Sequence, residues 1–160
     1  MPRKVLDFNW RIFHGQIVTE KRLISMKLSD GKCTLCMSNV EDVTHLFVKC
    51  PSHKSLWKYV TLILKAFDIP ELQEFNMIVG FLDENAIFDI VNTILSMTRW
   101  IIWKRRCSSK FEKNHKETIN IVYEFRYTIK KHFETVLLSK IISDKHTKDS
   151  VSTILDILSQ

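Results

Sequence analysis

Cysteine and histidine residues that could hold a metal ion lie close together in the N-terminal third of this 160-residue chain. Cys33, Cys36, His45 and Cys50 form the pattern Cys-x2-Cys-x8-His-x4-Cys within the segment CTLCMSNVEDVTHLFVKC. Three thiols and one imidazole match the number and kinds of ligand that a tetrahedral structural zinc site uses. Four protein ligands leave no open coordination position. We therefore predict one structural zinc ion here, not a catalytic one.

The spacing within the motif indicates how the ligands reach one ion. Two residues between Cys33 and Cys36 allow a tight turn that directs both thiols to one point. A short helix capped by Asp42 or Thr44 could carry His45 and present it on the same face as the last cysteine. The segment must therefore fold as a turn followed by a short helix.

Two other interpretations of these residues stay open at the level of sequence. Cys33 and Cys36 also have the spacing of a thiol–disulfide exchange pair, although that leaves His45 and Cys50 without a role. No βαβ pattern surrounds the pair, as such a redox protein would require. His53 is a second candidate ligand, ranked below His45 because a Cys50–His53 pairing would leave His45 unused.

Composition favours a helical protein of a reducing compartment. Apolar residues make up 45% of the chain, and Gly and Pro occur only three times each, which is few for an all-β protein. The N-terminal segment MPRKVLDFNW has no apolar signal region, and no run of about 18 apolar residues predicts a membrane span. We expect an intracellular protein without membrane contact, in either the nucleus or the cytoplasm. In a reducing compartment, clustered Cys and His indicate metal ligands.

Hydrophobic periodicity predicts the elements that hold the motif. Helices are expected at 8–14, 19–27, 52–67, 84–111 and 117–142, in addition to the short helix with His45. Residues 76–81 are ambiguous between strand and helix, 143–150 are expected to be a polar linker, and 151–158 an amphipathic tail. The predicted fold is mostly α, with short helices around a Cys3His zinc knuckle followed by a long antiparallel helical pair. A composition change near residue 68 predicts a zinc-binding lobe at 1–67 and a helical lobe at 68–160.

A basic segment spans the junction of the two long predicted helices. The range 99–131 contains ten Lys or Arg and three Glu, a net charge of +7 against +6 for the whole chain. Such a patch could neutralise the phosphates of RNA or DNA. The alternative is a solvated helix end whose cations complement the helix dipole. The candidate nucleic-acid contacts are Arg99, Lys104, Arg105, Arg106, Lys110 and Lys113.

Several motifs together resemble a known family. Trp-Arg-…-His-Gly, a Thr that leads a helix, the Cys-x2-Cys pair, an acidic residue before Thr-His-Leu-Phe, and a Cys followed by Trp resemble the reverse-transcriptase zinc-binding domain of LINE-type (non-LTR) retrotransposon polyproteins. The matching positions are Trp10, Arg11, His14, Gly15, Thr19, Cys33, Cys36, Glu41, Thr44, His45, Leu46, Phe47, Cys50 and Trp57. The run RWIIWKRRCSSKF resembles an Ile-Trp-x-x-Arg-Asn segment of that family, with Cys107 in place of Asn.

The resemblance implies a zinc-dependent accessory domain that helps a parent polyprotein hold template RNA or target DNA. The chain has no Tyr-x-Asp-Asp palm motif, no endonuclease signature and no GxGxxG, Walker A or GxSxG motif, so we predict a non-catalytic protein. Self-association and contacts with the parent polyprotein are the other partners considered. The alternative function is a zinc-stapled helical module for protein–protein interaction, without nucleic-acid binding.

Overall fold

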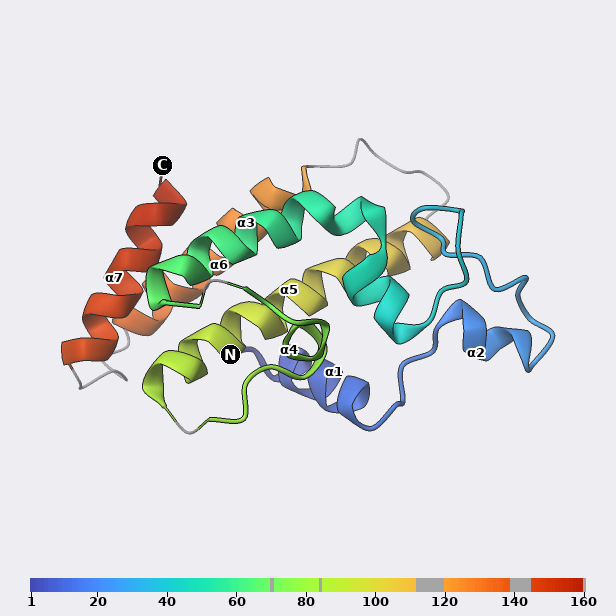
Figure 1. Cartoon of the computed structure of the whole chain (residues 1–160), viewed down its shortest axis with the longest axis horizontal. Helices are drawn as coiled ribbons and strands as arrows, with labels where there is room; N and C mark the ends of the chain where they lie inside the picture. The colour runs from blue at the N-terminus through green and yellow to red at the C-terminus, as the bar shows by residue number, and fades with distance from the viewer. Residues whose placement is uncertain (70, 84, 112–119, 139–144, 160) are drawn as a thin grey trace.

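The computed structural model describes residues 1–69, 71–83, 85–111, 120–138 and 145–159, and these residues form a helical fold (Figure 1). The α-helices are α1 Arg3–Phe13, α2 Glu20–Ile24, α3 Lys54–Leu64, α4 Glu74–Val79, α5 Ala86–Phe111, α6 Ile121–Leu138 and α7 Lys145–Ser159. Three short segments are a π-helix at His45–Lys49 and 3-10 helices at Pro51–His53 and Lys65–Phe67. In the described ranges, the extended pairing is a single bridge between Lys32 and Val40. The predicted mostly-α fold is confirmed.

Helix α5 forms the central rod of the fold. Its 26 residues contain no Gly or Pro, and its buried residues, among them Ile90, Ile94 and Ile101, recur at helical spacing. Helix α6 runs back beside α5 in the opposite direction and buries Phe125 and Ile129 (Figure 1). The long antiparallel helical pair predicted from the sequence is therefore present.

One hydrophobic core connects the N-terminal helices with the long pair. Helix α1 packs on α5, and α3 packs on α6, so the core is continuous from Val5 in α1 to Leu158 in α7. Phe8 of α1 lies in edge contact with Trp100 of α5, with ring centroids 5.3 Å apart. The division into lobes at 1–67 and 68–160 stays a prediction, and the core does not follow that boundary.

Two expectations about local structure need correction or completion. The segment 143–150 is not a polar linker where it is described, because α7 already begins at Lys145. The burial of Val151, Ile154 and Leu158 stabilises the apolar face of α7, and the polar residues before it extend the helix into solvent. Of the ambiguous segment 76–81, residues 76–79 belong to the helix α4, and Gly80 and Phe81 follow its end. The predicted helix ends at 117–119 and 139–142 lie outside the described residues.

None of the helices in the described part of the chain is long and apolar enough to cross a bilayer.

Candidate metal centre

The first two cysteines lie in a turn held by its own backbone. The Asn39 carbonyl accepts a hydrogen bond of 2.8 Å from the Cys33 amide, and the Cys33 carbonyl accepts one of 2.8 Å from the Met37 amide. Met37 adopts a left-handed conformation with φ of 58°, which reverses the chain after Cys36. Cys33 is buried and Cys36 is half-buried. The Cys-x2-Cys spacing thus forms the tight turn that the sequence predicts.

The other two ligands lie at the two ends of a single π-helical turn. The Cys50 amide donates a hydrogen bond of 2.8 Å to the His45 carbonyl, five residues earlier. The Asp42 carboxylate accepts a bond of 2.8 Å from the His45 amide and so caps the turn, as one of the two expected caps. An x4 spacing fits a π-turn because its hydrogen bond joins residues i and i+5. His45 and Cys50 therefore point to the same side.

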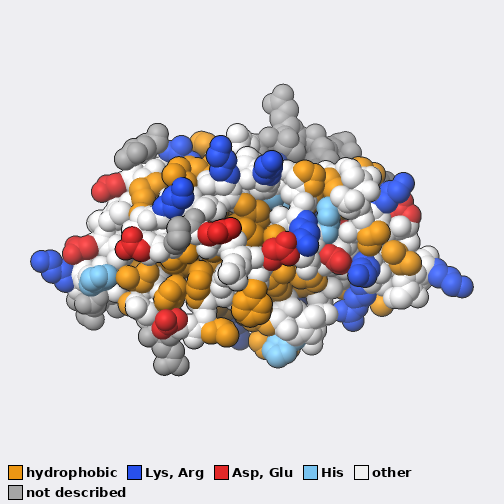
Figure 2. All heavy atoms as spheres, in the orientation of Figure 1, with side chains coloured by type: hydrophobic (Ala, Val, Ile, Leu, Met, Phe, Trp, Pro, Cys, Tyr) orange, Lys and Arg blue, Asp and Glu red, His pale blue; other side chains and the backbone are white. Residues whose placement is uncertain are grey.

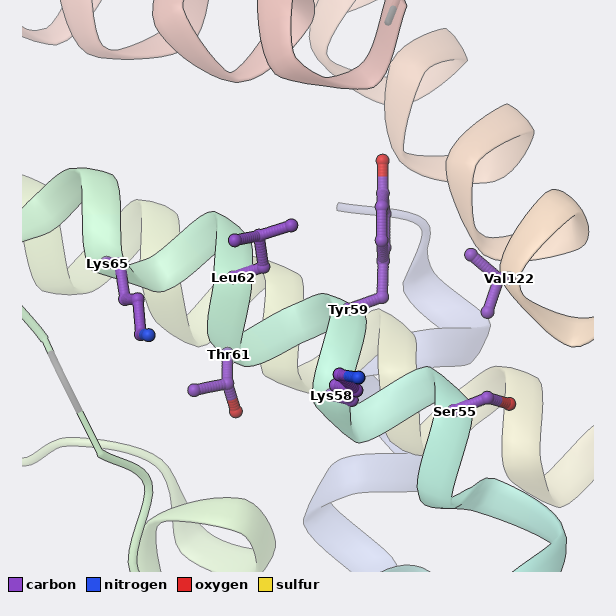
Figure 3. Close-up of a pocket in the computed structure, with 7 residues that line it drawn as sticks. All are labelled: Ser55, Lys58, Tyr59, Thr61, Leu62, Lys65 and Val122. Atoms are coloured by element: carbon purple, nitrogen blue, oxygen red, sulfur yellow. The ribbon is translucent and has the colours of Figure 1, made fainter.

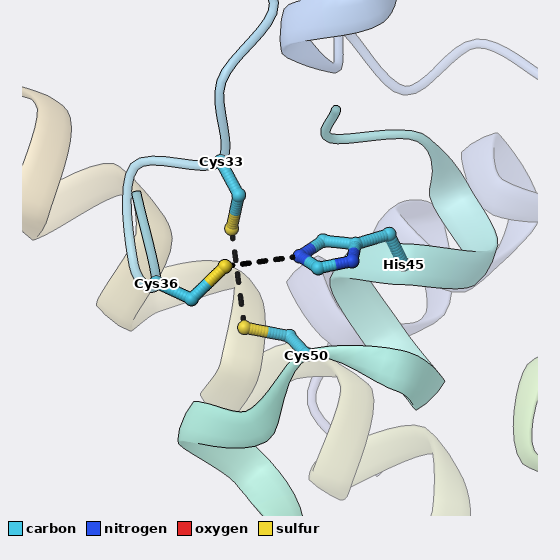
Figure 4. A group of neighbouring side chains, drawn as sticks. All are labelled: Cys33, Cys36, His45 and Cys50. Atoms are coloured by element: carbon cyan, nitrogen blue, oxygen red, sulfur yellow. Dashed lines mark hydrogen bonds between the residues drawn. The ribbon is translucent and has the colours of Figure 1, made fainter. Parts of the chain in front are cut away.

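The four side chains converge on one point (Figure 4). Their ligand atoms all lie within 4.8 Å of one another. The Cys33 and Cys50 Sγ atoms are 3.9 Å apart, and the Cys36 Sγ atom is 3.4 Å from His45 Nε2. A tetrahedral zinc ion with its usual bond lengths places two sulfurs ~3.8 Å apart and a sulfur and a nitrogen ~3.6 Å apart. The donor set and its separations therefore suit one zinc ion.

The acidities of the two buried thiols are linked. The hydrogen bond from Cys33 lowers the pKa of the Cys50 thiol to about 7. The same bond, together with burial, raises the pKa of the Cys33 thiol above its usual value. Zinc binds thiolates, so an ion at this point would displace the protons that the thiols carry.

His53 lies beside this centre but outside the ligand group. Its side chain is buried, and neither ring nitrogen has a hydrogen-bond partner among the described residues. Burial, with the charge of Arg105 and the nearby His45, lowers the pKa of His53 to about 4. The ligand group contains His45 and not His53, in agreement with the ranking made from the sequence.

A buried ion-pair network connects the cysteine turn to α5. The Arg106 guanidinium lies 2.5 Å from Glu20 Oε1 and 3.0 Å from Glu41 Oε1, and all three side chains are almost fully buried. Glu41 Oε1 also accepts a hydrogen bond from the Glu20 amide. The Glu41 amide donates a hydrogen bond of 2.9 Å to the Gly31 carbonyl. Glu41 thus contacts the start of the cysteine segment through its amide and Arg106 through its carboxylate. We name Glu20, Glu41, Arg106 and Lys110 the α5 clamp.

The remaining contacts of the α5 clamp complete its charge balance. Lys110 pairs with Glu20, and the Ser29 hydroxyl donates to the same carboxylate. Burial alone would raise the pKa of Glu20, but the bonds from Lys110 and Ser29 and the charge of Arg106 outweigh it and lower that pKa. Ser109 adds a bond of 3.0 Å to the Thr34 carbonyl inside the cysteine turn. Two cations and two carboxylates cancel, so this part of α5 contributes little net charge.

The sequence did not indicate the role of Glu20, and Arg106 was predicted to contact phosphate. One signal was available: Glu41 and Arg106 belong to the two motif segments on which the family resemblance depends. An acidic and a basic residue in separate motifs are compatible with an ion pair in space. The structure shows that this pair is formed and buried.

Two of the five predicted nucleic-acid contacts that the structure describes, Arg99 and Arg106, are buried. Arg99 is only 1% exposed, and its guanidinium donates to Asn9, Met77 and Ser96. Burial removes Arg99 and Arg106 from the cations that could reach a phosphate. Lys104 pairs with Glu124 at 2.6 Å, and Lys110 pairs with Glu20. Arg105 is half-buried, and Lys113 lies outside the described residues.

The fold and the site define a helical metal-binding module with a closed Cys3His group. Residues 1–57 match the family described as zinc-binding in reverse transcriptase. The match contains all four members of the ligand group and ends within α3, so the resemblance is confirmed for this segment. It includes no catalytic domain. No curated protein and no solved structure matches the chain.

Proposed function

We propose that the chain is a non-catalytic accessory module in which one structural zinc ion orders the N-terminal segment for nucleic-acid binding. The observation that carries the zinc proposal is the convergence of Cys33, Cys36, His45 and Cys50, with two separations, 3.9 Å and 3.4 Å, close to those of a tetrahedral zinc site. The bound ion would tie the cysteine turn to the π-helix. Protein atoms would occupy all four coordination positions of the ion, so the metal would have a structural role.

Metal content tests the zinc proposal. We expect about one zinc per chain after refolding with zinc, and chelation should unfold the cysteine turn before α5 and α6. Cys50→Ser should lose the ion, whereas Cys107→Ser is the matched control because Cys107 lies outside the ligand group. An absence of zinc from the refolded wild type, or its retention by Cys50→Ser, would contradict the proposal.

Support for nucleic-acid binding comes from the family of residues 1–57 and from the net charge of +6. The target is RNA or DNA held through its phosphates, so binding should weaken steeply with salt. A filter-binding titration of the zinc-loaded chain against RNA and DNA tests it. No binding to either at low salt would refute this part of the proposal.

A second candidate function, a protein-interaction module, is favoured by α1. Leu6, Trp10 and Phe13 recur at helical spacing, and each is about half exposed. Such an apolar stripe is suited to a second copy of the chain. Sedimentation at rising concentration should then show a dimer, and the double variant Leu6→Ser, Trp10→Ser should be monomeric. A wild type that is monomeric at all concentrations would argue against this function.

A further inference from the structure

Exposed lysines lie in a row along α3 and at the start of the 3-10 helix that continues it, in a segment where the sequence predicted no binding residue. Lys54, Lys58 and Lys65 fall within about 40° of one another around an ideal helix and span about 16 Å of its axis. We name these three residues the α3 lysine row. Figure 2 shows Lys and Arg side chains gathered over this helix.

The charges of the α3 lysine row are not neutralised by the described residues. No ion pair or hydrogen bond joins these side chains to the described part of the chain. The segment from Pro51 to Phe67 contains no Asp or Glu. This row therefore differs from Arg106 and Lys110, whose charges are cancelled by buried carboxylates.

An open pocket adjoins the row. It has a volume of about 470 Å³, with Tyr59, Leu62 and Val122 as apolar lining and Lys58 and Lys65 among its polar groups. Tyr59 and Leu62 project from α3 toward the side where Val122 of α6 lies (Figure 3). Leu62 is 57% exposed and Tyr59 is half-exposed, so an aromatic or apolar group of a ligand can reach both. The pocket is large enough for a planar base.

We infer that α3 is the contact surface for a single-stranded polynucleotide, an inference that rests on the proposed nucleic-acid binding. The phosphates would lie on the α3 lysine row, and an unstacked base would enter the pocket against Tyr59. A single strand offers regularly spaced negative charges together with accessible base faces, which matches lysines beside an aromatic pocket. A duplex hides its base faces and would use only the lysines.

Neutralising the α3 lysine row tests the phosphate contacts. The variant Lys54→Gln, Lys58→Gln, Lys65→Gln is compared with Lys131→Gln, Lys145→Gln, Lys148→Gln, which changes exposed lysines elsewhere by the same total charge. Anisotropy of labelled oligo(dT) and oligo(U) is titrated with salt, using zinc-loaded full chain. Each lost phosphate contact should reduce the salt slope by about 0.7, so the α3 variant should lose about 2 and the control far less.

Replacing Tyr59 tests the base contact separately. Tyr59→Leu keeps an apolar side chain against Phe125, whose ring centroid lies 6.1 Å from that of Tyr59, but removes the aromatic face. Affinity for the single strand should fall several-fold with an unchanged salt slope, and affinity for a duplex of the same sequence should stay the same. Equal affinity of Tyr59→Leu and wild type for oligo(dT) and oligo(U) would exclude the pocket as a base site.

The possible results distinguish a failure of the proposed α3 contact surface from a failure of the proposed nucleic-acid binding. Wild-type binding with an unchanged slope in the α3 variant would overturn the α3 surface and leave nucleic-acid binding intact. A wild type that binds neither oligonucleotide nor duplex would overturn both. Binding of an acidic peptide, lost in the α3 variant, without oligonucleotide binding would assign the surface to a protein partner and overturn the inference. Circular dichroism and zinc content of each variant establish that the fold is retained.

Discussion

The basic end of α5 and the lysine row of α3 carry similar side chains in different surroundings. On α5, Arg106 and Lys110 meet the carboxylates of Glu20 and Glu41, and Arg106 is buried with both. On α3, Lys58 and its two neighbours in the row face solvent without an acidic partner in the described ranges. Local charge density in the sequence therefore does not show which cations remain accessible to a phosphate after folding. A cation is available to a phosphate only if it has no acidic partner in the folded chain.

The largest expected effect comes from breaking the α5 clamp. Arg106→Ala leaves the buried carboxylates of Glu20 and Glu41 without their guanidinium, and we expect a loss of about 3–5 kcal/mol in unfolding free energy. Zinc affinity should fall with it, because Glu41 holds the cysteine turn. Urea unfolding and a competition titration with a zinc indicator measure the two effects.

Arg106→Lys sharpens the same test. One ammonium cannot donate to both carboxylates in the fixed geometry of a guanidinium, so this variant should recover only part of the stability. If Arg106→Ala unfolded and bound zinc like the wild type, the clamp would have no role in positioning the metal ligands.

A pH-dependent effect of intermediate size is expected at His53, beside the basic end of α5. Its pKa is lowered from 6.5 to about 4 in the folded chain. The unfolded chain therefore takes up a proton first, and stability falls as pH drops from about 6.5 toward 4. At pH 5.5 this loss amounts to about 1.4 kcal/mol relative to neutral pH.

His53→Leu should remove this part of the acid sensitivity. The variant and the wild type are unfolded in urea at pH 7.5 and 5.5, and the difference between them isolates His53 from zinc release, which affects both. Equal pH dependence in the two proteins would show that His53 is not held neutral by burial.

A smaller effect is expected at the half-exposed pair Lys104–Glu124, which links α5 to α6. Its atoms are 2.6 Å apart, but water reaches both side chains, so Lys104→Ala should cost about 0.2–1 kcal/mol. The cost should shrink in high salt, unlike that of Arg106→Ala. A cost that does not depend on salt would mean that the pair is better shielded than its exposure indicates.

The smallest effect on stability is expected at α3. Lys58→Gln alone should change the free energy of unfolding by no more than about 0.5 kcal/mol, because an exposed side chain without a partner loses nothing. Thermal unfolding of this variant beside Arg106→Ala tests the contrast between the two helices directly. A large loss in Lys58→Gln would show that the lysine is held by a contact and would weaken its assignment as a free cation.

Patterns within short segments predicted much of this molecule. The Cys-x2-Cys-x8-His-x4-Cys spacing located the ligand group, and apolar periodicity located α5 and α6. Both the ligand spacing and the apolar periodicity depend on residues that are close together in the chain, so they can be recognised in the sequence. The polar start of α7 at 145–150 was missed, whereas 151–158 was predicted as an amphipathic tail, because the stability of the helix comes from Val151 and Ile154 packing elsewhere in the fold.

The sequence alone determined the Cys3His group, the helical class and the family match of residues 1–57, since each follows from residue type and local spacing. Only the tertiary structure decided which charged side chains form buried ion pairs and which remain exposed to solvent. Arg106 and Glu41 are separated by 65 positions, yet their side chains lie 3.0 Å apart. The pairing of two charges depends on their distance in space and on the water excluded between them. Folding therefore turned part of the basic segment into an internal clamp and left the row on α3 open to a partner.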